Sequence, residues 1–443
     1  MAGGSSLTFN EATYVELSHH PWYSSYYPDT LFVRHPPLAF LLLGGWLALF
    51  GSGEAPLRLL SLVASLGGLV LIWHGARKVG GEAAGSVAAL AVGASFALHA
   101  YALQATMYPF AFTAAAAAAW ARVHRRDRLE ALSLAAFALT HLFGFLFLAL
   151  WTWRERERWR WCLARSWPAW AWIGLSIPLA MALNGEGDIM RLGGLGQAIR
   201  TVGTAGDAVA VRPLVHLASG ALAILALNPL LLGALGLNWR SWKDWAVGLA
   251  ILVPFFFLSS PYPRYALLPL PFVAVAGAPA VVAASRRLIA SSWQGVRRTL
   301  PAACVALSVL TLPVGFAYLH DGPDPRAAGD VPGEQDWRGA VNLLAESAQP
   351  SRLASSGPTA TSYYLSQLGW HVANRTDAPY HIGLAGPREL SVLCLDQPSD
   401  IATTTAQAWL VPDHWQGATD SIAQQGGREC GRVAGLVVFA TAC

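Results

Sequence analysis

Long apolar runs alternate with short basic clusters along most of the chain. A helix needs ~20 apolar residues to cross the ~30 Å hydrocarbon core of a bilayer, and many of the runs approach that length. Arg and Lys favour the cytoplasmic side of a membrane, so the clusters indicate which loops face the cytoplasm. The pattern predicts a polytopic, all-α membrane domain. Its apolar segments lie at about residues 55–75, 83–102, 108–121, 129–153, 166–184, 213–236, 246–260, 265–285 and 299–318.

The segment 129–153 does not fit a single span, because strongly basic runs flank both of its ends. One crossing would place one of these runs outside the cytoplasm. We therefore expect two short helices that meet at the sequence LTHLFG, residues 139–144, with His141 at a turn near the outer face. A polar turn at membrane depth is tolerated where it borders a water-filled cavity. With this division the membrane domain has about ten spans.

The apolar stretch 37–50 is too short to cross a membrane, since about fourteen residues give ~21 Å of helix. If it crossed, every later loop would change sides and the basic runs would lie outside. We expect it to lie along the outer interface instead, with 55–75 as the first span. Residues 1–36 are then outside. They show no signal-peptide pattern. We therefore expect either a further transmembrane helix before them or translocation of a short N-terminus. The second alternative is feasible because the first 33 residues lack Lys and Arg.

The tail, roughly residues 337–443, has the mixed composition of a soluble domain. DWRGAVNLLAESA and ATSYYLSQLGW have the pattern of amphipathic helices, and AGLVVFATA that of a buried strand. We predict a small α/β domain outside the cytoplasm, where a disulfide among Cys394, Cys430 and Cys443 is compatible with the redox state. The predicted division is a first outer loop at 1–54, a membrane domain at 55–318 and a soluble domain at 319–443.

Composition agrees with a membrane protein. Hydrophobic residues make up 54% of the chain and charged residues 13%, whereas soluble proteins carry ~25% charged residues. The 19 Trp residues suit the two membrane interfaces. A net charge of +4 is too small to indicate a nucleic-acid partner. The five Cys residues show no CxxC spacing, which argues against a metal site of that type.

The predicted topology gathers an unusual set of polar residues at the outer face. A lipid-facing surface has no need of them, and carboxylates beside cations suit a reaction with a proton to remove and an anionic leaving group. Each also has an ordinary reading: a helix-start carboxylate for Glu11, headgroup anchors for the Arg residues, a core position for His141. Their convergence on one face favours chemistry. The set is Glu11, Asp29, Arg34, His35, Tyr108, His141 and Arg264.

The order of motifs resembles a known superfamily. NEATYVELS, RHPPLAFLLLGGWLALFG, QATMYPF, LTHLFGF and RYALLPLPF follow one another over residues 9–285. They are similar to motifs of the polyprenyl-phosphate-sugar-dependent glycosyltransferases of the protein mannosyltransferase and aminoarabinose transferase superfamily (glycosyltransferase family 39-like), which have the GT-C fold. The resemblance implies an acidic pair in the first outer loop, an interfacial helix after it, and an Arg-Tyr pair, here Arg264 and Tyr265, near the donor phosphate.

The resemblance also implies an activity: inverting transfer of a sugar from a dolichyl- or undecaprenyl-phosphate donor to a protein, lipid or glycan acceptor, at the outer face of a prokaryotic cell membrane. Glu11 matches the second acid of the pair, while Asn10 replaces the first, so Glu11 or Asp29 is the expected catalytic carboxylate. Thr106 stands where relatives often have an acid or Arg. The implied donor contacts are Arg34, His35, Tyr108, His141, Arg264 and Tyr265.

Two other readings stay open. Ion-coupled transporters place charges near the membrane midplane, whereas these spans are nearly free of charged residues, which favours interfacial chemistry. A catalytically silent relative is the second alternative, and Asn10 is the residue that favours it. No cofactor is predicted, and a divalent metal is left open.

Overall fold

The computed structural model describes the chain in segments: residues 7–8, 11–12, 14–15, 18, 36–51, 53–141, 143–155, 157, 159–184, 267–287, 299, 301–309, 336–347, 352–356, 358–368, 381–384, 390–395, 401, 406–412 and 417–443. The chain divides into two compact units. The helical unit comprises residues 28–46 and 57–321, and the sheet unit comprises residues 1–27, 47–56 and 322–443. The predicted spans at 213–236 and 246–260 lie outside the described residues.

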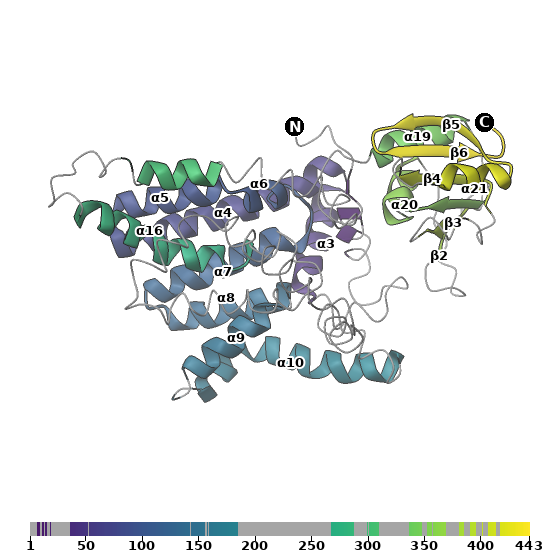
Figure 1. The fold of residues 1–443 in the computed structure, drawn as a ribbon. Coiled ribbons are helices and arrows are strands. Elements are labelled where there is room, and N and C mark those ends of the chain that lie inside the picture. The colour runs from purple at the N-terminus through teal and green to yellow at the C-terminus, as the bar shows by residue number, and fades with distance from the viewer. Residues whose placement is uncertain are drawn as a thin grey trace, which may run out of the picture. The chain divides into compact units, whose positions relative to one another are not determined.

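The helical unit is built from helices that pack side by side, several of them joined by short turns. Helix α7 packs on α8, α8 on α9 and α10, and α16 on α5 and α7 (Figure 1). Among the described residues, α4 is the one helix long and apolar enough to cross a membrane. The helices are α3 (Leu38–Phe50), α4 (Glu54–Gly80), α5 (Glu82–Gly93), α6 (Phe96–Tyr101), α7 (Met107–Val123), α8 (Asp127–Thr140), α9 (Phe143–Arg154), α10 (Trp159–Asn184) and α16 (Leu270–Arg287).

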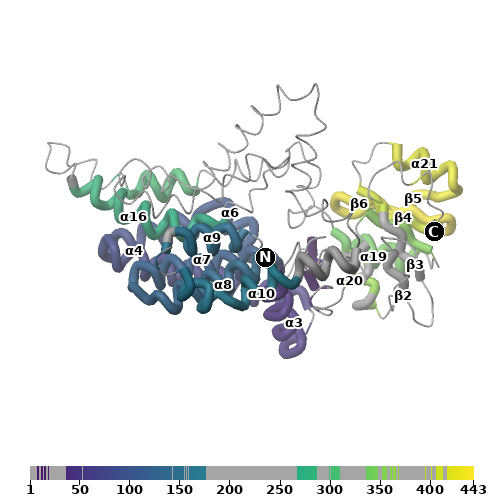
Figure 2. Tube along the Cα trace, turned by 90° about the horizontal axis from the view of Figure 1, so that it is seen from below, coloured from purple at the N-terminus to yellow at the C-terminus, as the bar shows by residue number. Residues whose placement is uncertain are grey.

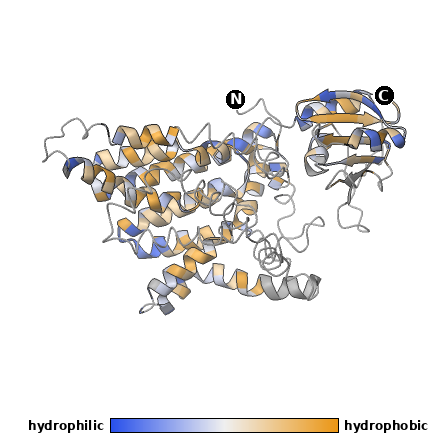
Figure 3. Cartoon of the chain, viewed as in Figure 1, coloured by the Kyte–Doolittle hydropathy of each residue, from blue (hydrophilic) through white to orange (hydrophobic). Residues whose placement is uncertain are grey.

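Helix α4 has two different faces. Its buried face carries small residues that allow close packing, as is usual between helices in membranes: Gly68 faces the ring of Phe112, and Thr113 of α7 donates to the carbonyl oxygen of Ala64 at 2.5 Å. The opposite face is apolar and open, with Leu59, Val63, Leu66 and Val70 between 48% and 55% exposed. Figure 3 shows the apolar character of these helices. An exposed apolar face on a long helix suits contact with lipid.

The predicted break inside 129–153 is confirmed. Helix α8 ends at Thr140, α9 begins at Phe143, and His141 lies between them in an extended conformation. Gly144 permits the sharp turn, since a Cβ there would stand 2.4 Å from the backbone nitrogen of Ala138. The N–H of Gly144 donates to the carbonyl oxygen of His141 at 2.8 Å. The helix predicted at 37–50 is present as α3 and ends at the same residue, Phe50; its location along the membrane interface stays a prediction.

Two predicted segments differ from the structure. The run 83–102 was expected to be continuous, but Ser95 is extended (φ −74°, ψ 143°) and separates α5 from α6. Its hydroxyl donates to the carbonyl oxygen of Val92 at 2.7 Å, which offers the backbone an alternative to continued helix. The segment predicted at 166–184 begins earlier than expected, because α10 starts at Trp159 within the basic run that precedes it. Arg is a good helix former, and Arg160 and Arg165 lie beside the rings of Trp159 and Trp161.

The sheet unit contains a six-stranded mixed sheet in the order β2-β3-β1-β4-β6-β5. Strand β1 is parallel to β3 and β4, and the other neighbours are antiparallel. The strands are β1 (Arg352–Ser355), β2 (His381–Leu384), β3 (Leu390–Cys394), β4 (Ala408–Pro412), β5 (Arg428–Val433) and β6 (Leu436–Ala440), and the helices are α19 (Trp337–Ser347), α20 (Pro358–Gln367) and α21 (Ala418–Gln424). Helices α19 and α20 and strand β6 occupy the three stretches with the predicted patterns.

Both faces of the sheet are covered. Every residue of β4 and β6 is buried, and side chains alternate between the faces of a strand. Helix α21 contributes Ile422 to a core with Trp409 and Phe439. Helices α19 and α20 pack on β1, β3, β5 and β6, and Figure 2 shows α19 and α21 on different sides of the strands.

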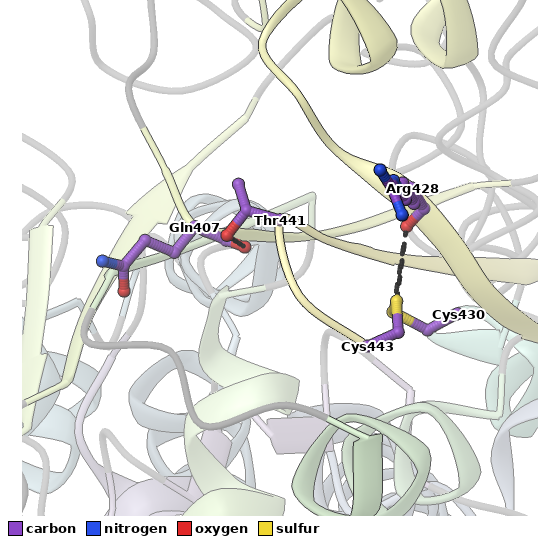
Figure 4. Close-up of a disulfide and its surroundings, with 5 residues drawn as sticks. All are labelled: Gln407, Arg428, Cys430, Thr441 and Cys443. Atoms are coloured by element: carbon purple, nitrogen blue, oxygen red, sulfur yellow. Dashed lines mark hydrogen bonds between the residues drawn. A yellow bond between two sulfur atoms is a disulfide. The ribbon is translucent and has the colours of Figure 1, made fainter.

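A disulfide closes the end of this sheet. Cys430 of β5 bonds to Cys443, with the Cα atoms 5.6 Å apart, a normal spacing for such a bond. Figure 4 shows Cys443 at the end of the segment that follows β6. Its sulfur lies 3.7 Å from the carbonyl oxygen of Arg428. Nearby, the N–H of Thr441 donates to the carbonyl oxygen of Gln407 at 2.9 Å. The pairing left open by the sequence is therefore Cys430 with Cys443.

Candidate active site

Three of the predicted site residues are described, and they lie in different units. Glu11 belongs to the sheet unit, whereas Tyr108 and His141 belong to the helical unit. The others, Asp29, Arg34, His35, Arg264 and Tyr265, lie outside the described residues.

Glu11 is fully buried at the start of a helical turn. Its Oε2 accepts a hydrogen bond from the N–H of Thr8 at 2.9 Å, and its own N–H donates to Oγ1 of Thr8 at 3.2 Å. This reciprocal pair is a capping box, in which Thr at the N-cap and Glu three residues later satisfy the free donors of a helix start. The carboxylate is thus held in one orientation by the backbone, and one of its oxygens serves the helix cap.

A second carboxylate, that of the partly buried Glu54, lies near the same segment, and sequence reasoning did not single it out. The N–H of Leu7 donates to the hydroxyl of Tyr364 at 2.5 Å, and this hydroxyl donates to Oε1 of Glu54 at 2.5 Å. Oε2 of Glu54 pairs with the guanidinium of Arg338. Leu7, Glu54, Arg338 and Tyr364 all belong to the sheet unit.

The charge states in this cluster are set by burial and by Glu54. Burial, together with the hydrogen bond to Glu54, raises the pKa of Tyr364 well above its usual value, so the phenol stays protonated. Burial alone would lower the pKa of Arg338, but the attraction of Glu54 outweighs it and the pKa is raised. Tyr364 therefore acts as a donor to Glu54 and an acceptor from Leu7 over the whole physiological pH range.

In the helical unit, Tyr108 and His141 come together from two helix boundaries. Tyr108 is in the first turn of α7, and His141 is in the break between α8 and α9. Their ring centroids are 5.4 Å apart, and the ring of Phe143 stacks on His141 at 5.3 Å. His141 is 4% exposed and Tyr108 is 5% exposed. The imidazole is therefore held between two aromatic rings in a buried position.

The tautomer of His141 follows from its backbone partner. The N–H of Phe143 lies 3.2 Å from Nδ1, so Nδ1 accepts that hydrogen bond and is unprotonated in the neutral ring. The ring proton is then on Nε2, which makes Nε2 a hydrogen-bond donor. A neutral imidazole that donates suits an acceptor-rich group such as a phosphate or a sugar hydroxyl.

Thr106 lies at the N-cap of α7, two residues before Tyr108. Its side chain is 2% exposed, and its hydroxyl has no hydrogen-bond partner among the described residues. The helix start also has no side-chain cap. A helix N-terminus favours negative charge, so the Thr106 hydroxyl and the backbone N–H groups at the start of α7 offer hydrogen-bond donors to an anion.

No metal cluster is evident in the described part of the chain, where no three His, Cys, Asp or Glu side chains gather.

Comparison with known proteins places these features in a class. Residues 34–149 match the family model described as dolichyl-phosphate-mannose-protein mannosyltransferase. The apo structure of ArnT from Cupriavidus metallidurans is similar over 100% of this chain and 95% of its own, with a TM-score of 0.58 and 15% identity. The structure of the same enzyme bound to undecaprenyl phosphate gives a TM-score of 0.54 with 14% identity and the same coverage. No curated protein sequence matches the chain.

These comparisons confirm the resemblance to the protein mannosyltransferase and aminoarabinose transferase superfamily. The described helices resemble the fold of ArnT, which is the GT-C fold. The structural likeness extends over the full chain, whereas the family model covers the segment from Arg34 to beyond His141.

Proposed function

We propose that this protein is an integral-membrane glycosyltransferase that moves a sugar from a polyprenyl phosphate to an acceptor at the outer face of the membrane. The observation that carries the proposal is the family-model match over residues 34–149. This segment contains Arg34, His35, Tyr108 and His141, four of the six residues expected to contact the donor. The similar ArnT structure with bound undecaprenyl phosphate supports a lipid phosphate as the carrier.

The proposed reaction is a single displacement. The acceptor hydroxyl loses its proton to a carboxylate, Glu11 or Asp29, and its oxygen attacks the anomeric carbon of the sugar. The bond from that carbon to the phosphate oxygen breaks, and the electron pair leaves with the polyprenyl phosphate. Attack opposite the leaving group inverts the anomeric configuration. Arg34, Arg264 and Tyr265 stabilise the released phosphate, because guanidinium groups bind phosphate oxygens in pairs.

His141 and Tyr108 are held rigidly, as a contact to the sugar donor requires. Hydrogen-bond donors that are already oriented stabilise developing charge without reorganisation during the reaction. The Nε2–H of His141 supplies one such donor, and the rings of Tyr108 and Phe143 fix the plane of the imidazole. Thr106 supplies a second donor at the start of α7.

The disulfide supports the proposed side of the membrane. Disulfides persist in oxidising compartments and are rare in the cytosol. Cys430 and Cys443 are both in the sheet unit, which also contains Glu11. We place the sheet unit and the catalytic carboxylate on the extracytoplasmic side for this reason.

The test is a transfer assay in lipid nanodiscs with radiolabelled polyprenyl-phosphate sugars. Acceptors are offered as a panel of hydroxyl-bearing peptides, lipids and glycans. Transfer by the wild-type protein, lost ~10²–10⁴-fold in Glu11→Gln or in Asp29→Asn, supports the proposal and identifies the base. The matched control is Glu429→Gln, which removes an exposed carboxylate of β5 in the same unit.

Two results would overturn the proposal. Donor binding without transfer to any acceptor would favour the catalytically silent relative. Two features agree with that alternative: Glu11 caps a helix, and Asn10 replaces the first acid of the pair. Absence of both donor binding and transfer would favour a transporter. Binding is measured separately, by retention of the labelled donor on the nanodisc-embedded protein.

A further inference from the structure

Three residues from distant parts of the sequence meet around the phenol of a fourth, Tyr364. The hydroxyl of Tyr364, on α20, contacts the backbone of Leu7 and the carboxylate of Glu54, which lie 357 and 310 residues away. Arg338, on α19, pairs with the same carboxylate and lies with its Cζ 5.9 Å from the Tyr364 ring centroid. Tyr364 is 5% exposed and Leu7 is fully buried. The cluster therefore connects the N-terminal segment around Leu7 to helices α19 and α20 of the sheet unit.

The hydrogen bonds in this cluster have defined directions. A backbone N–H only donates, so Tyr364 accepts from Leu7. A carboxylate only accepts, so Tyr364 donates its own proton to Glu54. Arg338 occupies the other oxygen of Glu54 and fixes that carboxylate in place. Phenylalanine at position 364 would keep the ring but lose both hydrogen bonds.

The same segment holds the catalytic carboxylate candidate. Leu7 and Thr8 present consecutive backbone N–H groups, one to Tyr364 and the other to Oε2 of Glu11. A shift of the Leu7 peptide moves Thr8, and Thr8 orients Glu11 through both bonds of the capping box. Tyr364 is thus linked to Glu11 through one peptide unit.

We propose that Tyr364, anchored by Glu54 and Arg338, is a positioning residue for Glu11. This inference rests on the proposed function, since it assumes that Glu11 takes the proton of the acceptor. It assigns α19 and α20 of the sheet unit a part in the reaction. These helices hold the N-terminal segment in the conformation that presents the carboxylate of Glu11. A misplacement of ~1 Å in a catalytic group can cost ~10²-fold in rate.

The decisive variant is Tyr364→Phe, with Tyr363→Phe as the matched control. Tyr363 is the half-buried neighbour, and its ring packs edge-on against Tyr364. We expect Tyr364→Phe to lower kcat ~10–100-fold with the KM for the donor changed less than ~3-fold, because donor contacts lie elsewhere. Tyr363→Phe should retain wild-type kcat. A partial return of activity is expected for Arg338→Lys compared with Arg338→Met, because Lys keeps the charge that holds Glu54.

A readout independent of activity separates this inference from the proposed function. Hydrogen exchange of the amides of Leu7 and Thr8 should become faster in Tyr364→Phe and stay unchanged in Tyr363→Phe. Unchanged exchange at both amides, or wild-type kcat in Tyr364→Phe, would overturn the positioning role even if the protein is an active transferase. Faster exchange in a protein without transfer activity would instead overturn the proposed function and leave the contact itself intact.

Discussion

The N–H of Phe143 donates to Nδ1 of His141 across 3.2 Å, at the point where α8 ends and α9 begins. This bond leaves the imidazole proton on Nε2. The break between the two helices therefore does more than reverse the chain. It produces a buried donor of fixed orientation beside Tyr108.

The two amide substitutions at His141 should differ in donor affinity. The side-chain amide of Gln reaches the place of Nε2 and preserves a donor there, while the shorter Asn reaches only the place of Nδ1. We expect His141→Asn to raise the KM for the polyprenyl-phosphate donor ~10-fold and His141→Gln to raise it less, since a hydrogen bond to a charged group contributes ~1.5–3 kcal/mol. Donor titrations of the two variants provide the measurement. Equal KM values, or the reverse order, would show that Nε2 does not contact the donor.

The break at His141 could be predicted from the sequence because the prediction uses the distribution of basic residues over a whole segment. Basic runs at both ends of 129–153 exclude a single crossing, and the position of the turn follows from the polar residues within it. The break at Ser95 could not be predicted in this way. It depends on one hydroxyl that bonds to Val92, and no change in hydropathy marks it.

The candidate site was predictable to different degrees. The capping box of Thr8 and Glu11 has a readable signature, Thr-x-x-Glu, although Glu11 was singled out for its chemistry rather than for this pattern. The cluster at Tyr364 has no such signature. Arg338 and Glu54 are 284 residues apart, and only folding of the sheet unit brings them together. Long-range pairs of this kind cannot be derived from local patterns.

Adjacent glycines in α4 should respond to alanine in opposite directions. A Cβ on Gly68 would lie 2.5 Å from Cε1 of Phe112, whereas a Cβ on Gly67 would meet nothing within 4 Å. Gly67→Ala should raise stability by up to ~1 kcal/mol through helix propensity. Gly68→Ala gains the same propensity but overpacks the α4–α7 contact, which costs ~1–3 kcal/mol. Thermal unfolding in detergent compares the two, and a Gly68→Ala variant at least as stable as Gly67→Ala would contradict the packing described here.

Reduction of the disulfide should destabilise the sheet unit. Cys430 and Cys443 are separated by 13 residues, and closing a loop of ~15 residues restricts the unfolded chain by ~3 kcal/mol. Dithiothreitol should therefore lower the unfolding temperature of the wild-type protein. The double variant Cys430→Ala and Cys443→Ala should unfold at the lower temperature with or without the reductant. If dithiothreitol lowers the unfolding temperature of both proteins equally, its effect arises elsewhere in the chain.

High pH should weaken the sheet unit through Tyr364. Its pKa in the folded protein is raised by burial and by the hydrogen bond to Glu54, whereas in the unfolded chain it is ~10. Below pH ~10 both states keep the phenolic proton, and the contribution of Tyr364 to stability is fully present. As the pH rises through the unfolded value, the unfolded state releases its proton and the folded state does not, so stability falls with increasing pH. We expect the difference in unfolding free energy between wild type and Tyr364→Phe to decrease between pH 9 and pH 11, as measured by chemical denaturation. A difference that stays constant over that range would show that the phenol titrates normally and is not held by Glu54.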